Sequence, residues 1–391
     1  MFFIINPRAA NVKQRTFGFP STNNPPQVKE LKHLEDDIYN LIASIKYKPA
    51  SNEFQKTMKA DKEKIMKMEE VIVPADKTPN LYKMDVNTYR KKLTENITKD
   101  YRKSSQAKVE EVTAEAAKIA RELNLDERMD TPTESEAFIT IKDHKDSFPG
   151  KVDCRLINPA KNHVGRISKD ILDRLNTEIR KNTGSNQWQS TTEVIKWFNR
   201  IPHKSKLSFF KFDIVAFYPS ISEDLLMRAL YWAQSMTKVT MGEINTIIHC
   251  RRSFLYHKQE AWVKKTNSDF DVGMGSLDSA EVCELVGLYI LHGVEKLIPQ
   301  ENVGLYRDDG LGVTDLPGPD LERLKQNVIC EFKKNGLKIT VETGSKITDF
   351  LDISLNLNSG TYRPFRKDPQ PPVYIHKGSN HPPHIKKNYQ K

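Results

Sequence analysis

The sequence has few cysteines, no long apolar run and no internal repeat. Its four cysteines, Cys154, Cys250, Cys283 and Cys330, stand alone among 391 residues. This spacing argues against a disulfide framework or a structural zinc site and is typical of a reduced protein. No stretch approaches the ~20 apolar residues of a membrane-spanning helix. The apolar start is shorter than the roughly 7–15 residues of a signal-peptide core. We therefore expect an intracellular protein, nuclear or cytoplasmic, that is not secreted and has no membrane partner.

Positive charge is in excess and is unevenly distributed. Lys and Arg total 61 and Asp and Glu total 51, so the formal net charge is +10. Residues 139–169 contain seven Lys or Arg and three Asp, a net of +4. Residues 360–391 contain seven Lys or Arg and one Asp, a net of +6. The two segments together account for the whole excess. Nucleic acid is the first candidate for an anionic partner, although an ordinary solvated surface explains the charge equally well.

Apolar periodicity predicts a mixed α and β fold of two or three domains. Helices are expected over 27–45, 53–69, 109–123, 166–181, 220–233, 279–297 and 320–334, the fifth of them opened by a capping box at Ser220-x-x-Glu223. Strands are expected over 71–74, 137–141, 152–157, 207–215, 303–306, 311–313, 337–341 and 350–357. Residues 1–26 and the last 27 residues are rich in proline and contain no predicted element.

Two motifs place carboxylates at strand ends. Asp213 ends an apolar strand, and Asp308 and Asp309 lie at the tip of a hairpin between two short strands. Adjacent carboxylates repel each other unless a cation lies between them. Taken singly, the motifs have ordinary interpretations as a strand-end cap and an Asp-Asp-Gly turn. If the three carboxylates meet on one antiparallel sheet, they would bind two divalent ions, which stabilise both oxygens of a phosphoryl displacement.

These motifs resemble the palm of a reverse transcriptase, most closely the enzymes of Penelope-like retroelements. Tyr306-Arg-Asp308-Asp309 is similar to the family's Tyr-x-Asp-Asp box, and Asp213 with Tyr218 is similar to its first carboxylate motif. The other similar segments are Val73-Pro-Ala-Asp76-Lys77, Ile139-Thr-Ile-Lys142-Asp-His-Lys145, Cys154-Arg155-Leu-Ile-Asn158, Gly273-Met-Gly275-Ser276, Phe350-Leu-Asp-Ile-Ser-Leu-Asn-Leu357 and Tyr374-Ile-His-Lys-Gly-Ser-Asn-His-Pro-Pro383. They follow the family order over residues 71–385.

The resemblance implies an α+β right-hand polymerase fold. A helical N-terminal extension would occupy residues 1–70, the fingers 71–205 and an antiparallel-sheet palm 206–358. Residues 359–391 would begin a thumb that is truncated in this chain. The implied activity is RNA-directed DNA polymerisation, in which dNTPs extend a DNA primer on an RNA template. The sequence does not indicate an oligomeric state.

The resemblance also implies roles for the carboxylates. Asp213 and Asp308 would be the main ligands of two Mg²⁺ ions, with Asp309 supporting them and Mn²⁺ as a possible substitute. The carbonyl of Ile214 would complete one coordination shell, since Mg²⁺ takes oxygen ligands. The ions would activate the primer hydroxyl and neutralise the leaving pyrophosphate.

Further residues would bind the nucleotide. Lys142 and Arg155 would hold the triphosphate, and Lys145 is a further candidate for that role; the ordinary alternative is an exposed charge. Tyr218 would pack under the sugar and exclude a 2′-hydroxyl, unless it is a core aromatic. Gly275 would let the backbone approach the template and the nascent pair. Lys346 is a candidate proton donor to the pyrophosphate.

One segment departs from the family pattern. Ser276-Leu-Asp278-Ser279-Ala280 lacks both prolines of the usual Ser-Pro-Leu-Ser-Pro run, and Asp278 is expected to add negative charge beside a nucleic-acid groove. Two alternatives to a reverse transcriptase therefore stay open. One is a non-catalytic, nucleic-acid-binding relic; the other is a palm-type polymerase that makes RNA, which an aromatic residue at Tyr218 disfavours.

Overall fold

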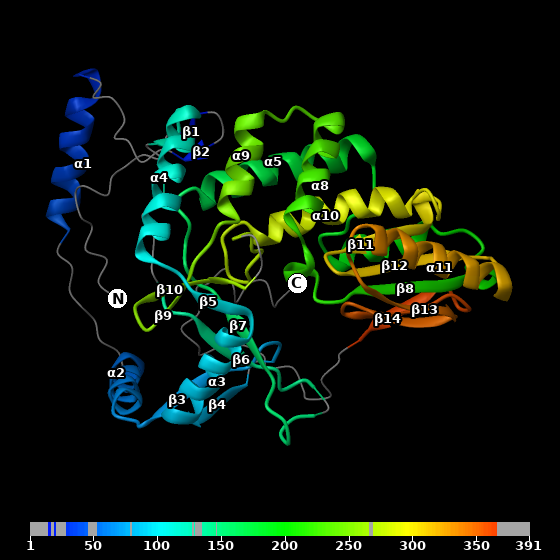
Figure 1. Cartoon of the computed structure of the whole chain (residues 1–391), viewed down its shortest axis with the longest axis horizontal. Helices are drawn as coiled ribbons and strands as arrows, with labels where there is room; N and C mark the ends of the chain where they lie inside the picture. Colours follow the sequence, from blue (N-terminus) through cyan, green and yellow to red (C-terminus); the bar gives the residue numbers. More distant parts are fainter. Residues whose placement is uncertain are drawn as a thin grey trace.

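The structure is a computed structural model, and Figure 1 shows the course of the chain. It describes residues 15–16, 19–20, 29–45, 53–78, 80–126, 129, 135–145, 147–265 and 269–365. The leader expected over residues 1–26 and the basic segment 360–391 lie largely outside these residues. None of the helices in the described ranges is long and apolar enough to cross a membrane.

A four-stranded antiparallel sheet with the order β11-β12-β8-β13 forms the centre of the fold. Its strands are β8 (Ser208–Ile214), β11 (Val303–Tyr306), β12 (Asp309–Thr314) and β13 (Ile339–Ser345). Side chains alternate between the two faces of β8. Phe210, Phe212 and Ile214 enter the main hydrophobic core, whereas Phe209 packs into a second core on the other face. Asp213 lies four residues after Phe209, so its side chain is on the same face of β8 as Phe209 and away from the main core.

Helices cover one face of this sheet, as Figure 1 shows for α8, α10 and α11. They are α5 (Gly165–Thr183), α8 (Glu223–Met236), α9 (Met241–Cys250), α10 (Ser279–Val294) and α11 (Gly318–Lys334). Helix α10 is buried on nearly all sides because it contacts α5, α8 and α11. This position explains its apolar sequence. The prediction of a mixed fold with an antiparallel sheet is confirmed.

The other face carries a second, smaller layer. It contains α6 (Thr191–Arg200), β14 (Ile347–Phe350), β15 (Ile353–Asn356) and β16 (Thr361–Pro364). Trp188, Trp197 and Phe350 pack together in its core. The prediction of one strand over 350–357 is wrong. The chain turns at Leu351, which has φ +53°, so two short strands pair there instead.

A third unit combines segments from before and after β8 and supplies one wall of the site. Its core consists of Leu93, Ile97, Ala137, Ile139, Leu255 and Trp262. Its elements are β3 (Glu70–Pro74), β4 (Leu81–Asp85), α3 (Val86–Asp100), β5 (Tyr101–Lys103), β6 (Phe138–Ile141), β7 (Cys154–Ile157), β9 (Leu255–His257) and β10 (Glu260–Lys264). Helix α4 (Gln106–Glu122) packs instead against α9 and adds Ala116 and Ala120 to the main core. The expected hairpin of strands near 137–141 and 152–157 is present as β6 and β7.

The remaining elements are short or lie near the N-terminus. They are β1 (Arg15–Thr16), β2 (Phe19–Pro20), α1 (Lys32–Ser44), α2 (Glu53–Met66), α7 (Phe217–Ser220) and the 3-10 helices at Lys29–Leu31, Lys204–Lys206 and Gln300–Asn302. Helix α1 forms as predicted, but none of its residues is buried.

The predicted capping box at Ser220 is wrong. Ser220 is the last residue of α7, and α8 begins after Ser222, whose hydroxyl accepts a hydrogen bond from the Leu225 amide at 3.1 Å. A capping box does occur at α9, where Thr240 and Glu243 satisfy each other's backbone amides. Sequence spacing alone did not distinguish the end of one helix from the start of the next.

Candidate active site

The hairpin of β11 and β12 makes a two-residue turn. Tyr306 pairs with Asp309, which leaves Arg307 and Asp308 at the tip. Arg307 has φ +54°, a left-handed backbone conformation that residues other than glycine rarely adopt. Its guanidinium lies 5.8 Å from the centre of the Tyr306 ring. Behind the turn, a Cβ on Gly310 would lie 2.0 Å from the Phe212 ring. Glycine at this position therefore allows the hairpin to lie closely against β8.

The pairing of β12 with β8 brings the predicted carboxylates to one end of the sheet. Asp309 is the register partner of Asp213, and the amide of Ile214 donates to the carbonyl of Asp308 at 2.9 Å. Asp213 and Asp308 line a large cleft. Within the described ranges, no group of three His, Cys, Asp or Glu side chains has the geometry of a metal site. The donor chemistry, carboxylate and carbonyl oxygen, nevertheless fits a hard cation such as Mg²⁺.

The cleft has a volume of about 1600 Å³ and lies between the central sheet and the third unit. Of the predicted site residues it brings together Lys142, Lys145, Arg155, Asp213, Ile214, Tyr218, Gly275 and Asp308. Residues from the β6–β7 hairpin, β8, α7, the loop before α10 and the β11–β12 turn thus share one space, although Lys142 and Asp308 are 166 residues apart.

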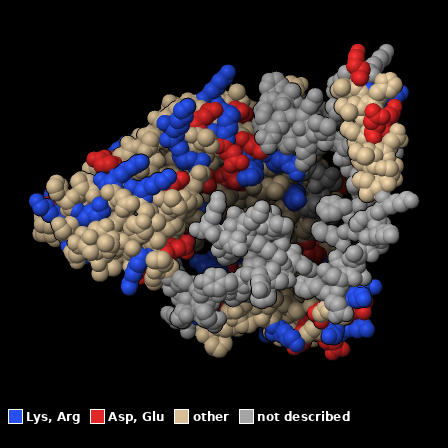
Figure 2. All heavy atoms as spheres, turned by 180° about the vertical axis from the view of Figure 1, so that it is seen from behind, with Lys and Arg blue, Asp and Glu red and all other residues tan. Residues whose placement is uncertain are grey.

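One corner of the cleft is strongly basic. Lys142, Lys145 and Arg155 come from the hairpin of β6 and β7, within the +4 segment of the sequence. Burial, and then the charges of Arg155 and Lys145, lower the pKa of Lys142. An anion bound in this corner would relieve that repulsion. On the face in Figure 2, by contrast, Lys and Arg are interspersed with Asp and Glu.

Asp76 orients this basic corner, a role that the sequence did not reveal. One of its carboxylate oxygens lies 3.0 Å from Nη1 of Arg155, and its side chain is 5% exposed. Nearby, Asp143 accepts hydrogen bonds from Thr78, from Asn80 at 3.0 Å and from Tyr82 at 2.9 Å. These bonds tie the loop after β3 to the hairpin. The signal for Asp76 was its place in the Val73-Pro-Ala-Asp76-Lys77 segment.

Tyr218 reaches the cleft through a sharp change of direction after β8. Ala216 has φ +50°, and α7 begins at Phe217. Phe217 is buried in the main core. Tyr218 is partly buried and lines the cleft, and burial raises the pKa of its hydroxyl to about 12. The side chain therefore stays neutral and presents an aromatic surface in the cleft that Asp213 also lines.

Gly275 is held close to the protein's own backbone. Its φ is +108°, and a Cβ would lie 2.3 Å from the carbonyl oxygen of Asn158. The Asn158 amide also donates to the Met274 carbonyl at 2.9 Å. The loop before α10 is therefore fastened to the end of β7. This internal contact requires glycine whether or not a template lies against the loop.

The expectation that Asp278 adds negative charge beside a groove is wrong. Its side chain is 1% exposed and forms an ion pair with Arg251, which is equally buried. The hydroxyl of Ser168 also donates to Asp278. Arg251 donates to Ser279 at 3.4 Å, and Ser279 donates to the Gly273 carbonyl at 2.8 Å. The pair thus anchors the glycine-containing loop from behind.

Lys346 does not reach the cleft. Lys346 directly follows β13. The last residue of β13, Ser345, pairs with Phe209 near the start of β8, whereas Asp213 lies near the end of that strand. The ammonium of Lys346 donates to the carbonyls of Ser205 and Leu207. The structure therefore places Lys346 at the far end of the sheet, where it cannot donate a proton at the carboxylates.

Comparison with known proteins identifies the fold. No protein-family model matches the chain, and no curated protein matches it. The telomerase of Candida albicans in complex with a TWJ fragment of telomeric RNA is similar, with a TM-score of 0.53 and 12% identity over 88% of this chain and 64% of that one. The apo telomerase of Candida tropicalis truncated from its C-terminal domain has a TM-score of 0.52 and 13% identity over 75% of this chain and 63% of that one.

The chain thus spans less than two thirds of the length of these two telomerase chains. At such low identity the similarity is one of fold. The fold around the cleft is similar to that of these telomerases, and the residues in the cleft must carry any argument about chemistry.

Proposed function

We propose that the chain is an RNA-directed DNA polymerase of a retroelement, of the Penelope-like type. The observation that carries the proposal is the cleft itself, in which the carboxylates of Asp213 and Asp308 share one space with the basic corner at Lys142 and Arg155. Phosphoryl transfer needs acidic metal ligands beside cationic triphosphate ligands. The ordered sequence motifs and the telomerase-like fold support the same activity.

Asp213 and Asp308, with the carbonyl of Ile214 and with Asp309 in support, would hold Mg²⁺, or Mn²⁺ in its place. Bound there, the metal would supply charge neutralisation and a more acidic primer hydroxyl. The remaining work belongs to side chains. Arg155, oriented by Asp76, would bind phosphate oxygens through its fork, and Lys142 would add a point charge.

Tyr218 would select the sugar. Its ring is partly buried beside the strand end that carries Asp213, so it has little freedom to move away from a substrate. A ribose 2′-hydroxyl directed at this ring would meet an apolar surface and lose its hydrogen bonds to water. Deoxynucleotides would be preferred on an RNA template paired with a DNA primer.

Primer extension tests the proposal. The full chain should extend a DNA primer on an RNA template with dNTPs and Mg²⁺. Asp308→Asn and Asp213→Asn should each lower the rate by about a thousandfold, because several kcal/mol of transition-state stabilisation depend on the metal ligands. Asp320→Asn is the matched control, since Asp320 lies in the first turn of α11 and pairs with Arg323.

The outcomes separate the alternatives. Faster incorporation of rNTPs than of dNTPs would identify an RNA-making polymerase. Salt-dependent RNA binding without extension would identify a non-catalytic relic. Equal rates for wild type and Asp308→Asn would refute the proposed mechanism.

A further inference from the structure

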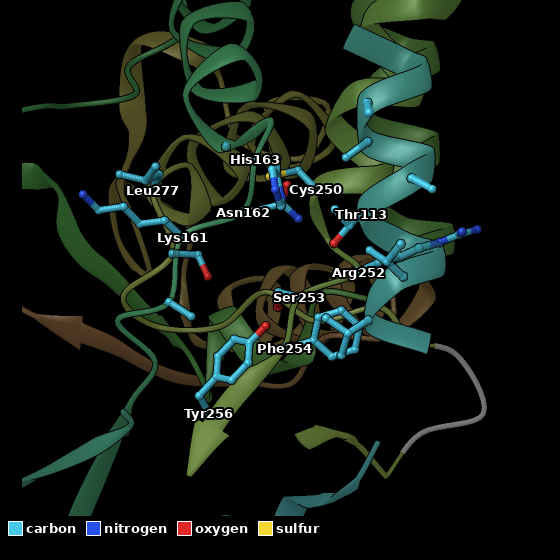
Figure 3. A pocket seen from close by; sticks show the side chains of 18 of the residues that line it. Thr113, Lys161, Asn162, His163, Cys250, Arg252, Ser253, Phe254, Tyr256 and Leu277 are labelled. Atoms are coloured by element: carbon cyan, nitrogen blue, oxygen red, sulfur yellow. The ribbon is translucent and has the colours of Figure 1, made fainter. Parts of the chain in front are cut away.

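A second cavity of about 430 Å³ lies behind the loop that precedes α10 (Figure 3). Its walls are α4, the segment 160–165, the segment 250–256 and the loop itself at Leu277. Ser276 lines both this cavity and the large cleft. The loop that carries Gly275 is therefore a thin partition between the two spaces.

The lining combines flat apolar surfaces with separate hydrogen-bonding groups. Figure 3 shows Phe254 and Tyr256 on one side and Asn162 and Thr113 on others. Ser253 also lines the cavity, and its buried hydroxyl has no hydrogen-bond partner within the described part of the chain. A planar heterocycle with polar edges, such as a nucleobase, matches this pattern, because base recognition combines aromatic stacking with hydrogen bonds to the base edges.

Charge distinguishes a base within a strand from a free nucleotide. Among the described lining residues, Lys161 and Arg252 are cationic, and Glu110 and Asp278 are acidic. Arg252 is paired with Glu115 at 2.6 Å, and Figure 3 shows Lys161 at the edge of the cavity beside Leu277. A free triphosphate would need several cations, as in the basic corner of the cleft. One lysine at the edge suits a single backbone phosphate of a strand that passes from the cleft.

We propose that this cavity binds an unpaired base of the template strand, ahead of the position that is being copied. The proposal rests on the proposed function, which places a template in the cleft. A strand that crosses the partition at Ser276 would place its unpaired base against both Tyr256 and Phe254 and direct the base edge toward Ser253 and Asn162. The cavity would thereby hold the next part of the template in single-stranded form.

The test measures binding without nucleotides, so that it does not depend on catalysis. Fluorescence anisotropy compares the affinity of the full chain for a primer–template duplex with a blunt template end and with a four-nucleotide 5′ overhang. Wild type should bind the overhang duplex more tightly. Tyr256→Ala and Phe254→Ala should each reduce that advantage at least about fivefold, which corresponds to loss of one weak base–aromatic stack. Binding of the blunt duplex should not change. Tyr231→Ala is the matched control, because Tyr231 on α8 is 50% exposed and does not line the cavity.

A second variant covers the case in which an alanine variant fails to fold. Ala117→Trp keeps both aromatic residues but fills the cavity from α4, and it should give the same loss. A 4-thiouridine placed in the overhang should cross-link to residues 250–256. Equal affinity of wild type for both duplexes, or an overhang advantage that survives Ala117→Trp, would overturn the inference. Primer extension is measured separately, so a chain that extends primers without this advantage retains its proposed function.

Discussion

Removing the charge of Asp278 tests how the loop beside the cleft is held. Asp278 and Arg251 have side chains that are each 1% exposed, and each makes a further hydrogen bond, to Ser168 and to Ser279 respectively. Burial alone would lower the pKa of Arg251, but the neighbouring Asp278 charge raises it above its ordinary value. Because a guanidinium is effectively always protonated, Arg251 stays charged in Asp278→Asn and becomes a buried cation without that counter-ion.

The structure sets the size of the effect. Breaking a buried ion pair by removing one partner costs about 3–5 kcal/mol, because the other charge is left uncompensated. For 391 residues unfolding together, this corresponds to a fall in melting temperature of about 4–6 °C. Replacing both partners with apolar residues, as in Arg251→Met with Asp278→Leu, removes both desolvation penalties. That double variant should be within about 1–2 kcal/mol of wild type or more stable.

Thermal and urea unfolding of Arg251→Met, Asp278→Leu and the double variant form a double-mutant cycle, and Asp278→Asn is measured beside them. The matched control is Glu260→Gln, which breaks a surface pair with Lys103 at 2.7 Å whose side chains are 45% and 60% exposed. It should lose about 0.2–1 kcal/mol. Losses for Asp278→Asn no larger than for the control, or additive effects in the cycle, would refute the reasoning.

Four other changes probe the cleft. Tyr218→Val should raise the ratio of rNTP to dNTP incorporation about tenfold in single-nucleotide extension; an unchanged ratio would exclude a contact with the sugar. Asp76→Asn should raise KM for dNTPs about tenfold with little change in kcat, because Arg155 loses the partner that orients it. Gly275→Ala should destabilise the chain by about 1–3 kcal/mol in urea unfolding, since its Cβ would lie 2.3 Å from a carbonyl oxygen; wild-type stability would contradict the described loop. Because the pKa of Lys142 is lowered and its neutral amine cannot bind phosphate, dNTP affinity should fall as pH rises, beginning at a lower pH than for an ordinary lysine. Lys142→Arg, which stays charged, should remove that pH dependence, and a persistent dependence would assign it to another group.

Local patterns predicted the elements that carry the chemistry. The strand at Asp213 and the hairpin at Asp308 have strong apolar flanks, and both form as expected. Helix α3 and the strands β9 and β10 were not predicted. In α3 only Leu93 and Ile97 are buried, so its apolar period is weak. Short strands such as β9 are defined by their partners rather than by their own residues.

Side-chain environments were harder to predict than elements. The sequence predicted that Asp278 adds negative charge beside a groove. That prediction was wrong because its ion-pair partner, Arg251, lies 27 residues earlier and meets it only in the folded chain. Lys346 suggested a catalytic proton donor because its position along the sequence says nothing about which end of β13 it occupies. Asp76 was visible as part of a motif, but its role required the contact with Arg155.

The sequence by itself determined the kinds of groups available: paired carboxylates at strand ends, a basic hairpin, an aromatic residue after Asp213 and an unusual loop before α10. Residue type and local periodicity decide these because they depend on neighbours along the chain. Only the tertiary structure decided which groups meet. Strand register brought Asp213 beside Asp309, packing buried Asp278 against Arg251, and the arrangement of α4 against the 250–256 segment created a second cavity. Such pairings depend on long-range contacts, whose distances no local pattern contains.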